Sequence, residues 1–209
     1  MKNSWKLFIC LLFVFGVSSC SLPTFKREKV QNYMLWYQFD SQKSLCKSSY
    51  NVLLRPISSN NSLNTTFMLV LNNTTNMASI PYCRWKIPLP QMVDELIYRD
   101  LSISKIFHSV SKSPIYDYDI IISTHIFSFW IDLSPSPTLK AELLFEVSQR
   151  YEGDNSLLFK NTYEVSRSLN NLNPEEYATV ASEATKEIIQ HFLEELCDVL
   201  QRNGDKTKK

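Results

Sequence analysis

The chain has 209 residues, 44% of them hydrophobic, and its 22 Lys and Arg nearly balance its 21 Asp and Glu. No basic field for nucleic acid exists, so we expect no nucleic-acid partner. Residues 20–209 are long enough for one domain that buries roughly 70% of its unfolded surface.

The N-terminus has the pattern of a bacterial lipoprotein signal peptide. Two lysines precede an apolar run over residues 7–16, which is too short to span a membrane. The run ends in Val17-Ser18-Ser19-Cys20, an aliphatic residue and two small ones before a cysteine. We therefore predict a signal peptide over residues 1–19 and lipidation of the Cys20 thiol. The alternative is an ordinary signal peptide that is followed by chance by a cysteine.

Lipidation at Cys20 has consequences for where the protein resides. A mature chain that begins there carries about three acyl chains, and each buried CH₂ contributes roughly 0.8 kcal/mol, so the anchor is firm. Ser21 rather than Asp follows the cysteine, which by enterobacterial sorting rules predicts the outer membrane, facing the periplasm. Residues 20–29 then serve as the lipidated N-terminus and tether.

Three cysteines remain in the mature domain, Cys46, Cys83 and Cys197. Their spacing matches no metal motif, and we expect neither a metal nor a cofactor. The preferred interpretation is three free thiols. A Cys46–Cys83 bridge, which an oxidising periplasm would permit, is the alternative.

The first half of the domain contains three predicted strands and one helix. Apolar and aromatic runs predict strands over 30–37, 50–57 and 66–71. Asparagine-rich segments beside the third strand predict turns. Four glycosylation-type sequons fall here and are interpreted as polar loops, at Asn60, Asn64, Asn72 and Asn73. Apolar residues at 3.6 spacing predict a helix over 90–107.

The second half predicts an antiparallel meander and a long helix. Residues 118–131 form a β-rich run that is apolar on both faces, and 138–151 alternates cleanly. The segment 157–169 returns, so 118–169 is a three-stranded meander. The side chains of 138–151 that face the core are Leu139, Ala141, Leu143, Phe145 and Val147.

The last helix is predicted from its capping residues and its apolar stripe. Asn173 caps it, Pro174 opens it, and two glutamates follow in its first turn. Asn203-Gly204 is predicted to end it, leaving a disordered tail over 203–209 and a folded domain over 30–202. The stripe that packs on the sheet is Tyr177, Val180, Ala181, Ala184, Ile188, Phe192 and Leu196.

This order of elements resembles the ABC-type transport auxiliary lipoproteins, which accompany MCE (mammalian cell entry) lipid-transport systems. The resemblance covers nearly the whole mature chain, by pattern more than by invariant residues. Where the family often has a Val/Pro-rich segment and a Tyr-Arg before the Trp, this chain has only Tyr82-Cys83-Arg84-Trp85. The matching segments are Tyr33-Met34-Leu35, Trp85, Pro88, Phe107-His108-Ser109-Val110, and Tyr118-Asp119-Ile120 through Phe127 and Phe129.

The resemblance implies an α/β domain with a mixed sheet and helices packed against it. It also implies partners: the membrane through the lipid anchor, an MCE-domain protein, an ABC permease and ATPase complex, and further copies of the chain in a ring. The role is the outer-membrane-anchored element of a lipid-transport machine. The competing hypothesis is an envelope-assembly cofactor of the lipopolysaccharide-export or peptidoglycan-synthase-activator type.

We find no catalytic constellation in the sequence and expect no enzyme. His108, His125 and His191 are scattered and have no metal partner at helical spacing. Asp117 and Asp119 flank Tyr118 at a spacing of two, so both could face a cation, although strand-entry aspartates are usually solvated. A lipid-anchored hydrolase would need a nucleophile that the sequence does not reveal.

Binding is the remaining kind of function. Six aromatic residues could line an interface or a lipid groove, although strand residues of this kind usually form core. Trp130, beside a strand end, is the one predicted to be exposed. The six are Tyr33, Trp36, Tyr37, Phe127, Phe129 and Trp130.

Overall fold

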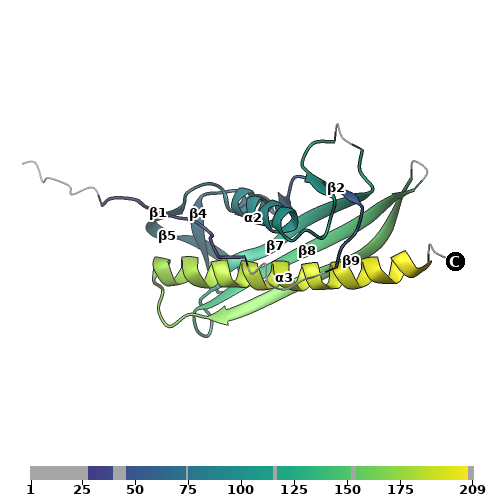
Figure 1. The fold of residues 1–209 in the computed structure, drawn as a ribbon. Helices are drawn as coiled ribbons and strands as arrows, with labels where there is room; N and C mark the ends of the chain where they lie inside the picture. The colour runs from purple at the N-terminus through teal and green to yellow at the C-terminus, as the bar shows by residue number, and fades with distance from the viewer. Residues whose placement is uncertain (1–27, 40–45, 74, 115–116, 152–153, 207–209) are drawn as a thin grey trace, which may run out of the picture.

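The computed structural model describes residues 28–39, 46–73, 75–114, 117–151 and 154–206. It confirms the predicted α/β class: these residues form one mixed sheet of nine strands with two α-helices packed against it (Figure 1). The predicted signal peptide and Cys20 lie outside the described residues. So does most of the predicted tether.

The sheet is organised around the long strand β7 (Ile120–Asp132). β8 (Thr138–Tyr151) pairs antiparallel along its length, and β9 (Asp154–Ser168) pairs antiparallel with β8, which confirms the meander. The five predicted core side chains of β8 are fully buried. Along the other edge of β7, three strands pair in parallel, in chain order: β2 (Asn51–Leu54), β3 (Ser58–Ser59) and β4 (Phe67–Asn72).

Three further strands complete the two ends of the sheet. β5 (Asn76–Trp85) forms a hairpin with β4, β1 (Gln31–Tyr33) pairs in parallel with β5, and β6 (Ser109–Ser111) pairs in parallel with β2. The sequence prediction missed β5 and β6 and made the first strand too long. β5 departs from a regular strand pattern: it contains Pro81, and Tyr82 has a φ of 57°.

Residues with positive φ explain where the β4–β5 hairpin turns and why the following helix ends earlier than the sequence predicts. Asn73, with a φ of 62°, occupies the left-handed conformation that asparagine tolerates in tight turns. A short 3₁₀ turn, η1 (Asn61–Leu63), lies in the asparagine-rich segment before β4. α2 (Leu89–Ile103) ends four residues earlier than predicted, because Lys105 has a φ of 57° and cannot continue it.

The long helix α3 (Pro174–Lys206) runs along the sheet (Figure 1). Asn173 caps it as predicted: its side-chain oxygen accepts the Glu175 N–H at 3.0 Å. The predicted stripe is fully buried except for Val180, which is half-buried, and Phe192 stacks on Phe145 of β8 with ring centroids 4.0 Å apart. Helical structure continues to Lys206, past the end predicted at Asn203-Gly204.

Candidate functional site

The described chain begins with an edge strand and a segment that leaves the sheet for the helices. Burial alternates along it: Leu35 and Tyr37 are 2% and 7% exposed, whereas Met34 and Trp36 are 51% and 62% exposed. The backbone N–H of Trp36 donates to the Ser182 hydroxyl on α3 at 3.1 Å. The segment is therefore held by its inward side chains and its backbone, while alternate side chains stand in solvent.

A buried polar cluster secures the same segment to α2. The Tyr37 hydroxyl donates to Asp100 Oδ2 at 2.5 Å, and Asp100 is 1% exposed. Arg99 Nε donates to Asp100 Oδ1 at 2.7 Å, and Arg99 Nη1 donates to the Tyr37 carbonyl at 3.0 Å. The guanidinium carbon also lies 4.6 Å from the Tyr37 ring centre. These contacts satisfy a carboxylate that would otherwise be costly to bury.

Burial dominates the acid–base properties of this cluster. It raises the pKa of Tyr37 far above its ordinary value, and the neighbouring Asp100 carboxylate raises it further. Burial also raises the pKa of Asp100, while the hydrogen bonds from Arg99 and Tyr37 oppose that rise. Tyr37 is consequently a neutral donor to Asp100 at neutral pH.

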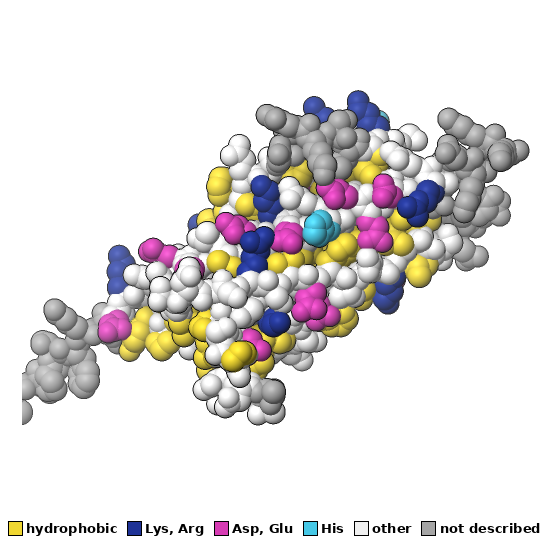
Figure 2. All heavy atoms as spheres, turned by 90° about the horizontal axis from the view of Figure 1, so that it is seen from below, with side chains coloured by type: hydrophobic (Ala, Val, Ile, Leu, Met, Phe, Trp, Pro, Cys, Tyr) yellow, Lys and Arg dark blue, Asp and Glu magenta, His cyan; other side chains and the backbone are white. Residues whose placement is uncertain are grey.

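Exposed apolar side chains and cations surround the start of the described chain. Gln31 lies opposite Cys83 and Asn32 opposite Arg84 in the β1–β5 register, so the last residues of β5 lie next to the start of the described chain. All the members described here are solvent-exposed, and Figure 2 shows hydrophobic side chains reaching the surface at this end of the molecule. We call this set the N-terminal surface: Lys29, Val30, Met34, Trp36, Tyr82, Arg84 and Lys86.

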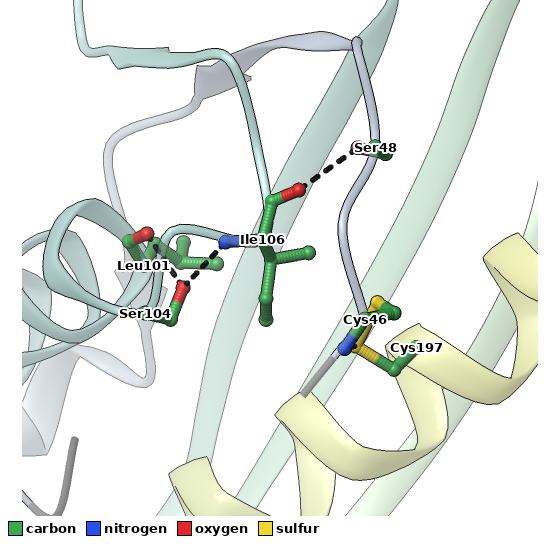
Figure 3. Close-up of a disulfide and its surroundings, with 6 residues drawn as sticks. All are labelled: Cys46, Ser48, Leu101, Ser104, Ile106 and Cys197. Atoms are coloured by element: carbon green, nitrogen blue, oxygen red, sulfur yellow. Dashed lines mark hydrogen bonds between the residues drawn. A yellow bond between two sulfur atoms is a disulfide. The ribbon is translucent and has the colours of Figure 1, made fainter. Parts of the chain in front are cut away.

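A disulfide joins Cys46 to Cys197, so both interpretations of the cysteines were wrong (Figure 3). The bond links the segment before β2 to α3 across 151 residues, with the two Cα atoms 5.4 Å apart. Cys83 is free and buried. Spacing along the sequence could not reveal this pair, because the tertiary fold alone brings α3 against residue 46.

The segment after the disulfide is tied to the residues that follow α2. The Ser48 hydroxyl donates to the Ile106 carbonyl at 3.2 Å, and the Ser48 backbone N–H donates to the same oxygen at 2.7 Å (Figure 3). The Ser104 hydroxyl donates to the Leu101 carbonyl at 2.8 Å. The disulfide and these bonds therefore connect α3, the segment before β2 and the C-terminal end of α2.

The histidines and the aspartate pair do not form a common site. His125 is half-buried on β7 with its Nδ1 2.8 Å from the Ser58 hydroxyl, and His108 and His191 are exposed elsewhere. Asp119 Oδ2 accepts the Asn51 N–H at 2.7 Å, which ties β2 to β7, while Asp117 is exposed. Among the described residues no three His, Cys, Asp or Glu side chains are grouped to hold a metal.

The six aromatic residues separate into core and surface. Tyr37 and Phe129 are buried, Tyr33 and Trp130 are half-buried against the core, and Phe127 is partly exposed. The prediction that Trp130 is the exposed aromatic was wrong, because Trp36 exposes far more of its side chain. Sequence reasoning gave Arg99 and Asp100 no role, although their position near the apolar spacing of the predicted helix is the signal that could have shown a buried charge.

Two surface hollows lie beside the parallel strands. One, of about 450 Å³, is lined by residues of the paired strands β2 and β6, Ser109 among them, and by Asp117 and Tyr118. The other, of about 510 Å³, lies between β3 and α2 and includes Asp94 and Glu95. Neither lining includes a histidine or a cysteine. Both carboxylates of the second hollow pair with Lys112, at 2.6 and 2.8 Å.

Charge over the described surface is mixed. Figure 2 shows acidic and basic side chains interspersed over one face, without a field of a single sign. None of the described helices is long and apolar enough to cross a membrane.

Comparison with known proteins establishes the fold. The chain matches no family model, and no curated protein matches its sequence. A crystal structure of a DUF330 protein from Xanthomonas campestris superposes with a TM-score of 0.76 at 14% identity, covering 84% of this chain and 99% of that one. The fold therefore defines a class, the mixed α/β architecture of that DUF330 protein.

Other solved structures are similar to a lesser degree. An uncharacterised protein superposes with a TM-score of 0.61 at 12% identity, covering 81% of this chain and 99% of that one. A lipoprotein from Neisseria meningitidis reaches a TM-score of 0.36 at 8% identity, covering 67% of this chain and 98% of that one. A score that low does not establish a common fold.

Proposed function

We propose that this chain is a lipoprotein anchored in the outer membrane through Cys20, with its α/β domain in the periplasm. It acts there as a non-enzymatic auxiliary component of an ABC/MCE-type system that moves lipids or other hydrophobic molecules between the inner and outer membranes. The observation that carries the proposal is Val17-Ser18-Ser19-Cys20 behind a short apolar run.

The Cys46–Cys197 disulfide supports the compartment independently of the signal. Disulfides persist in oxidising compartments such as the bacterial periplasm and are rare in the cytosol. A chain that is exported and anchored would meet those conditions. The disulfide and the signal belong to different parts of the sequence, so neither inference depends on the other.

The transport role rests on the order of elements. The elements follow the order by which this chain resembles the transport auxiliary lipoproteins. That order is a strand at Tyr33, a helix after Trp85 and Pro88, a meander beginning near Ile120 and a long final helix. The exposed N-terminal surface beside the anchor would place such a component at the membrane. Partners would be an MCE-domain protein and the permease and ATPase of the transporter.

The anchor is tested by the Cys20→Ala substitution in a bacterial host. Intact mass should show the wild type beginning at an acylated Cys20 and fractionating with the outer membrane. Cys20→Ala should be released or remain unprocessed, because the thioether cannot form. Identical processing and solubility of the two proteins would reject the lipoprotein assignment.

The transport role is tested by capture from a detergent extract of membranes. The tagged wild type should recover an MCE-domain protein, and an unrelated outer-membrane lipoprotein serves as the control. Repeated recovery of a peptidoglycan synthase or a lipopolysaccharide-export protein instead, with no change in lipid asymmetry on deletion of the gene, would favour the envelope-assembly role.

A further inference from the structure

We propose that the N-terminal surface rests on the bilayer that holds the Cys20 lipid, with the Trp36 and Tyr82 rings in the headgroup region. The proposal rests on the lipid anchor of the proposed function and adds the side of the domain that faces the membrane. It assigns the exposed apolar side chains near β1 a binding partner, a phospholipid surface that contains anionic headgroups.

The length of the tether brings this surface to the bilayer. Seven residues separate Cys20 from Glu28, the first described residue. An extended chain rises at most ~3.6 Å per residue, so Glu28 lies within about 30 Å of the anchored cysteine. The end of the domain that carries β1 is thus the end held at the membrane, at a high effective concentration of lipid.

The chemistry of the surface matches a membrane interface. Trp36 and Tyr82 are 62% and 55% exposed. Tryptophan and tyrosine are enriched at membrane–water interfaces, because their rings are apolar but carry a polar group. Val30 and Met34 add exposed apolar area. Exposure of this kind at one end of a domain marks an interaction site more often than a chance scatter does.

Charge on the surface favours anionic headgroups. Lys29, Arg84 and Lys86 are exposed there, and the sequence places Lys26 and Arg27 immediately before. Glu28 and Glu175 are acidic groups at the same end. The five basic residues named here outnumber these two, as expected for a surface that approaches phosphatidylglycerol.

The experiment uses Trp36 as a reporter in the full mature protein. Its three tryptophans are Trp36, Trp85 and Trp130, of which Trp85 is buried in the core. Acylated protein is reconstituted into vesicles of phosphatidylethanolamine and phosphatidylglycerol, with and without brominated phosphatidylcholine, which quenches tryptophans that enter the interface. We expect quenching in the wild type, loss of most of it in Trp36→Phe, and its retention in the matched control Trp130→Phe.

Folding and charge are controlled separately. Trp36 joins α3 through its backbone N–H, which Trp36→Phe keeps, and equal thermal unfolding of the two proteins checks this. The double variant Arg84→Glu, Lys86→Glu should reduce quenching in vesicles that contain phosphatidylglycerol and leave it unchanged in vesicles without it. An equal reduction of quenching in both kinds of vesicle would overturn the proposed attraction of Arg84 and Lys86 to anionic headgroups.

Flotation with the vesicles separates the two proposals. Wild type that floats but shows no quenching retains the anchor and overturns the membrane-facing surface. Wild type that does not float overturns the anchor and this inference with it. Quenching lost in Trp130→Phe rather than in Trp36→Phe would overturn the inference, because another face of the domain would then contact the bilayer. A change of oligomeric state in Trp36→Phe would also overturn it, because Trp36 would then contact a second copy of the chain.

Discussion

At the scale of single residues, the contact between Tyr37 and Asp100 decides how the N-terminal segment is held. The two residues are 63 positions apart and both are buried. A hydrogen bond to a buried carboxylate is stronger than one between neutral groups, and leaving its acceptor unpaired costs more than the bond contributes. The segment that carries Trp36 therefore depends on a polar contact as well as on apolar packing.

Replacing Tyr37 by Phe removes this donor and nothing else of comparable size. We expect the free energy of unfolding to fall by roughly 1.5–3 kcal/mol, the value of a hydrogen bond to a charged group. Tyr82→Phe is the matched control, because that residue is exposed, and its change should stay within about 0.5 kcal/mol. Urea denaturation of both variants measures the difference. Equal losses would show that the hydroxyl of Tyr37 does not stabilise the fold.

The raised pKa of Asp100 predicts a dependence of stability on pH. Because the folded pKa lies above the unfolded one, the contribution of Asp100 is fully present below the unfolded pKa and is lost as the pH rises through the folded pKa. The stability of the wild type relative to Asp100→Asn should therefore decrease as the pH rises from acid toward neutral. Denaturant unfolding across that range measures it, and an increasing difference would contradict the assignment.

At the scale of elements, the disulfide makes α3 part of the same unit as the segment before β2. Cys197 lies on the buried side of α3, and Phe192, one and a half turns earlier, stacks on Phe145 of β8. The helix is thus fixed both to the sheet and, through Cys46, to residues that lead into β2. Cross-linking positions so distant in sequence restricts the unfolded chain strongly.

Removing the disulfide in the double variant Cys46→Ala, Cys197→Ala should lower the free energy of unfolding by roughly 2–5 kcal/mol. Reductant should lower the wild type to the level of this variant and leave the variant itself unchanged. Cys83→Ala is the control, because it should keep the full sensitivity to reductant. A wild type that is indifferent to reductant would show that the bond does not form.

At the scale of the whole molecule, the predicted lipid at Cys20, the disulfide and the N-terminal surface all fit the proposed extracytoplasmic lipoprotein. The full chain carries a net charge of +1, and the two lysines that leave with the predicted signal change this to −1. Such a chain has no long-range attraction for anionic surfaces as a whole. Orientation at a membrane must then come from local features, the tether and the basic, aromatic end of the sheet.

The number of reactive thiols tests this description of the mature protein. After export and denaturation without reductant, one thiol should react, that of Cys83, because Cys46 is bonded to Cys197 and the proposed lipoprotein is acylated at Cys20. Cys83→Ala should then show none. Mass spectrometry after alkylation counts the modified residues. Three reactive thiols in the wild type would support the free-thiol interpretation instead.

Local patterns in the sequence were enough to predict the elements whose faces differ most. β8 has the same bounds in the structure as its alternation predicts, and α3 begins at Pro174, directly after the predicted capping residue. Periods of 2 and 3.6 residues determine which side chains share a face, so one buried face leaves a readable pattern. β5 and β6 left none, since the first contains a proline and a residue with positive φ and the second has three residues.

The sequence by itself determined the class of fold, the meander, the final helix and the predicted lipidation site at Cys20, because each depends on neighbouring residues. Only the tertiary structure decided that Cys46 meets Cys197, that Tyr37 meets Asp100, and that Trp36 rather than Trp130 is exposed. These features join residues dozens of positions apart. Contacts at such separations form where packed elements meet, and local periodicity carries no record of which elements those will be.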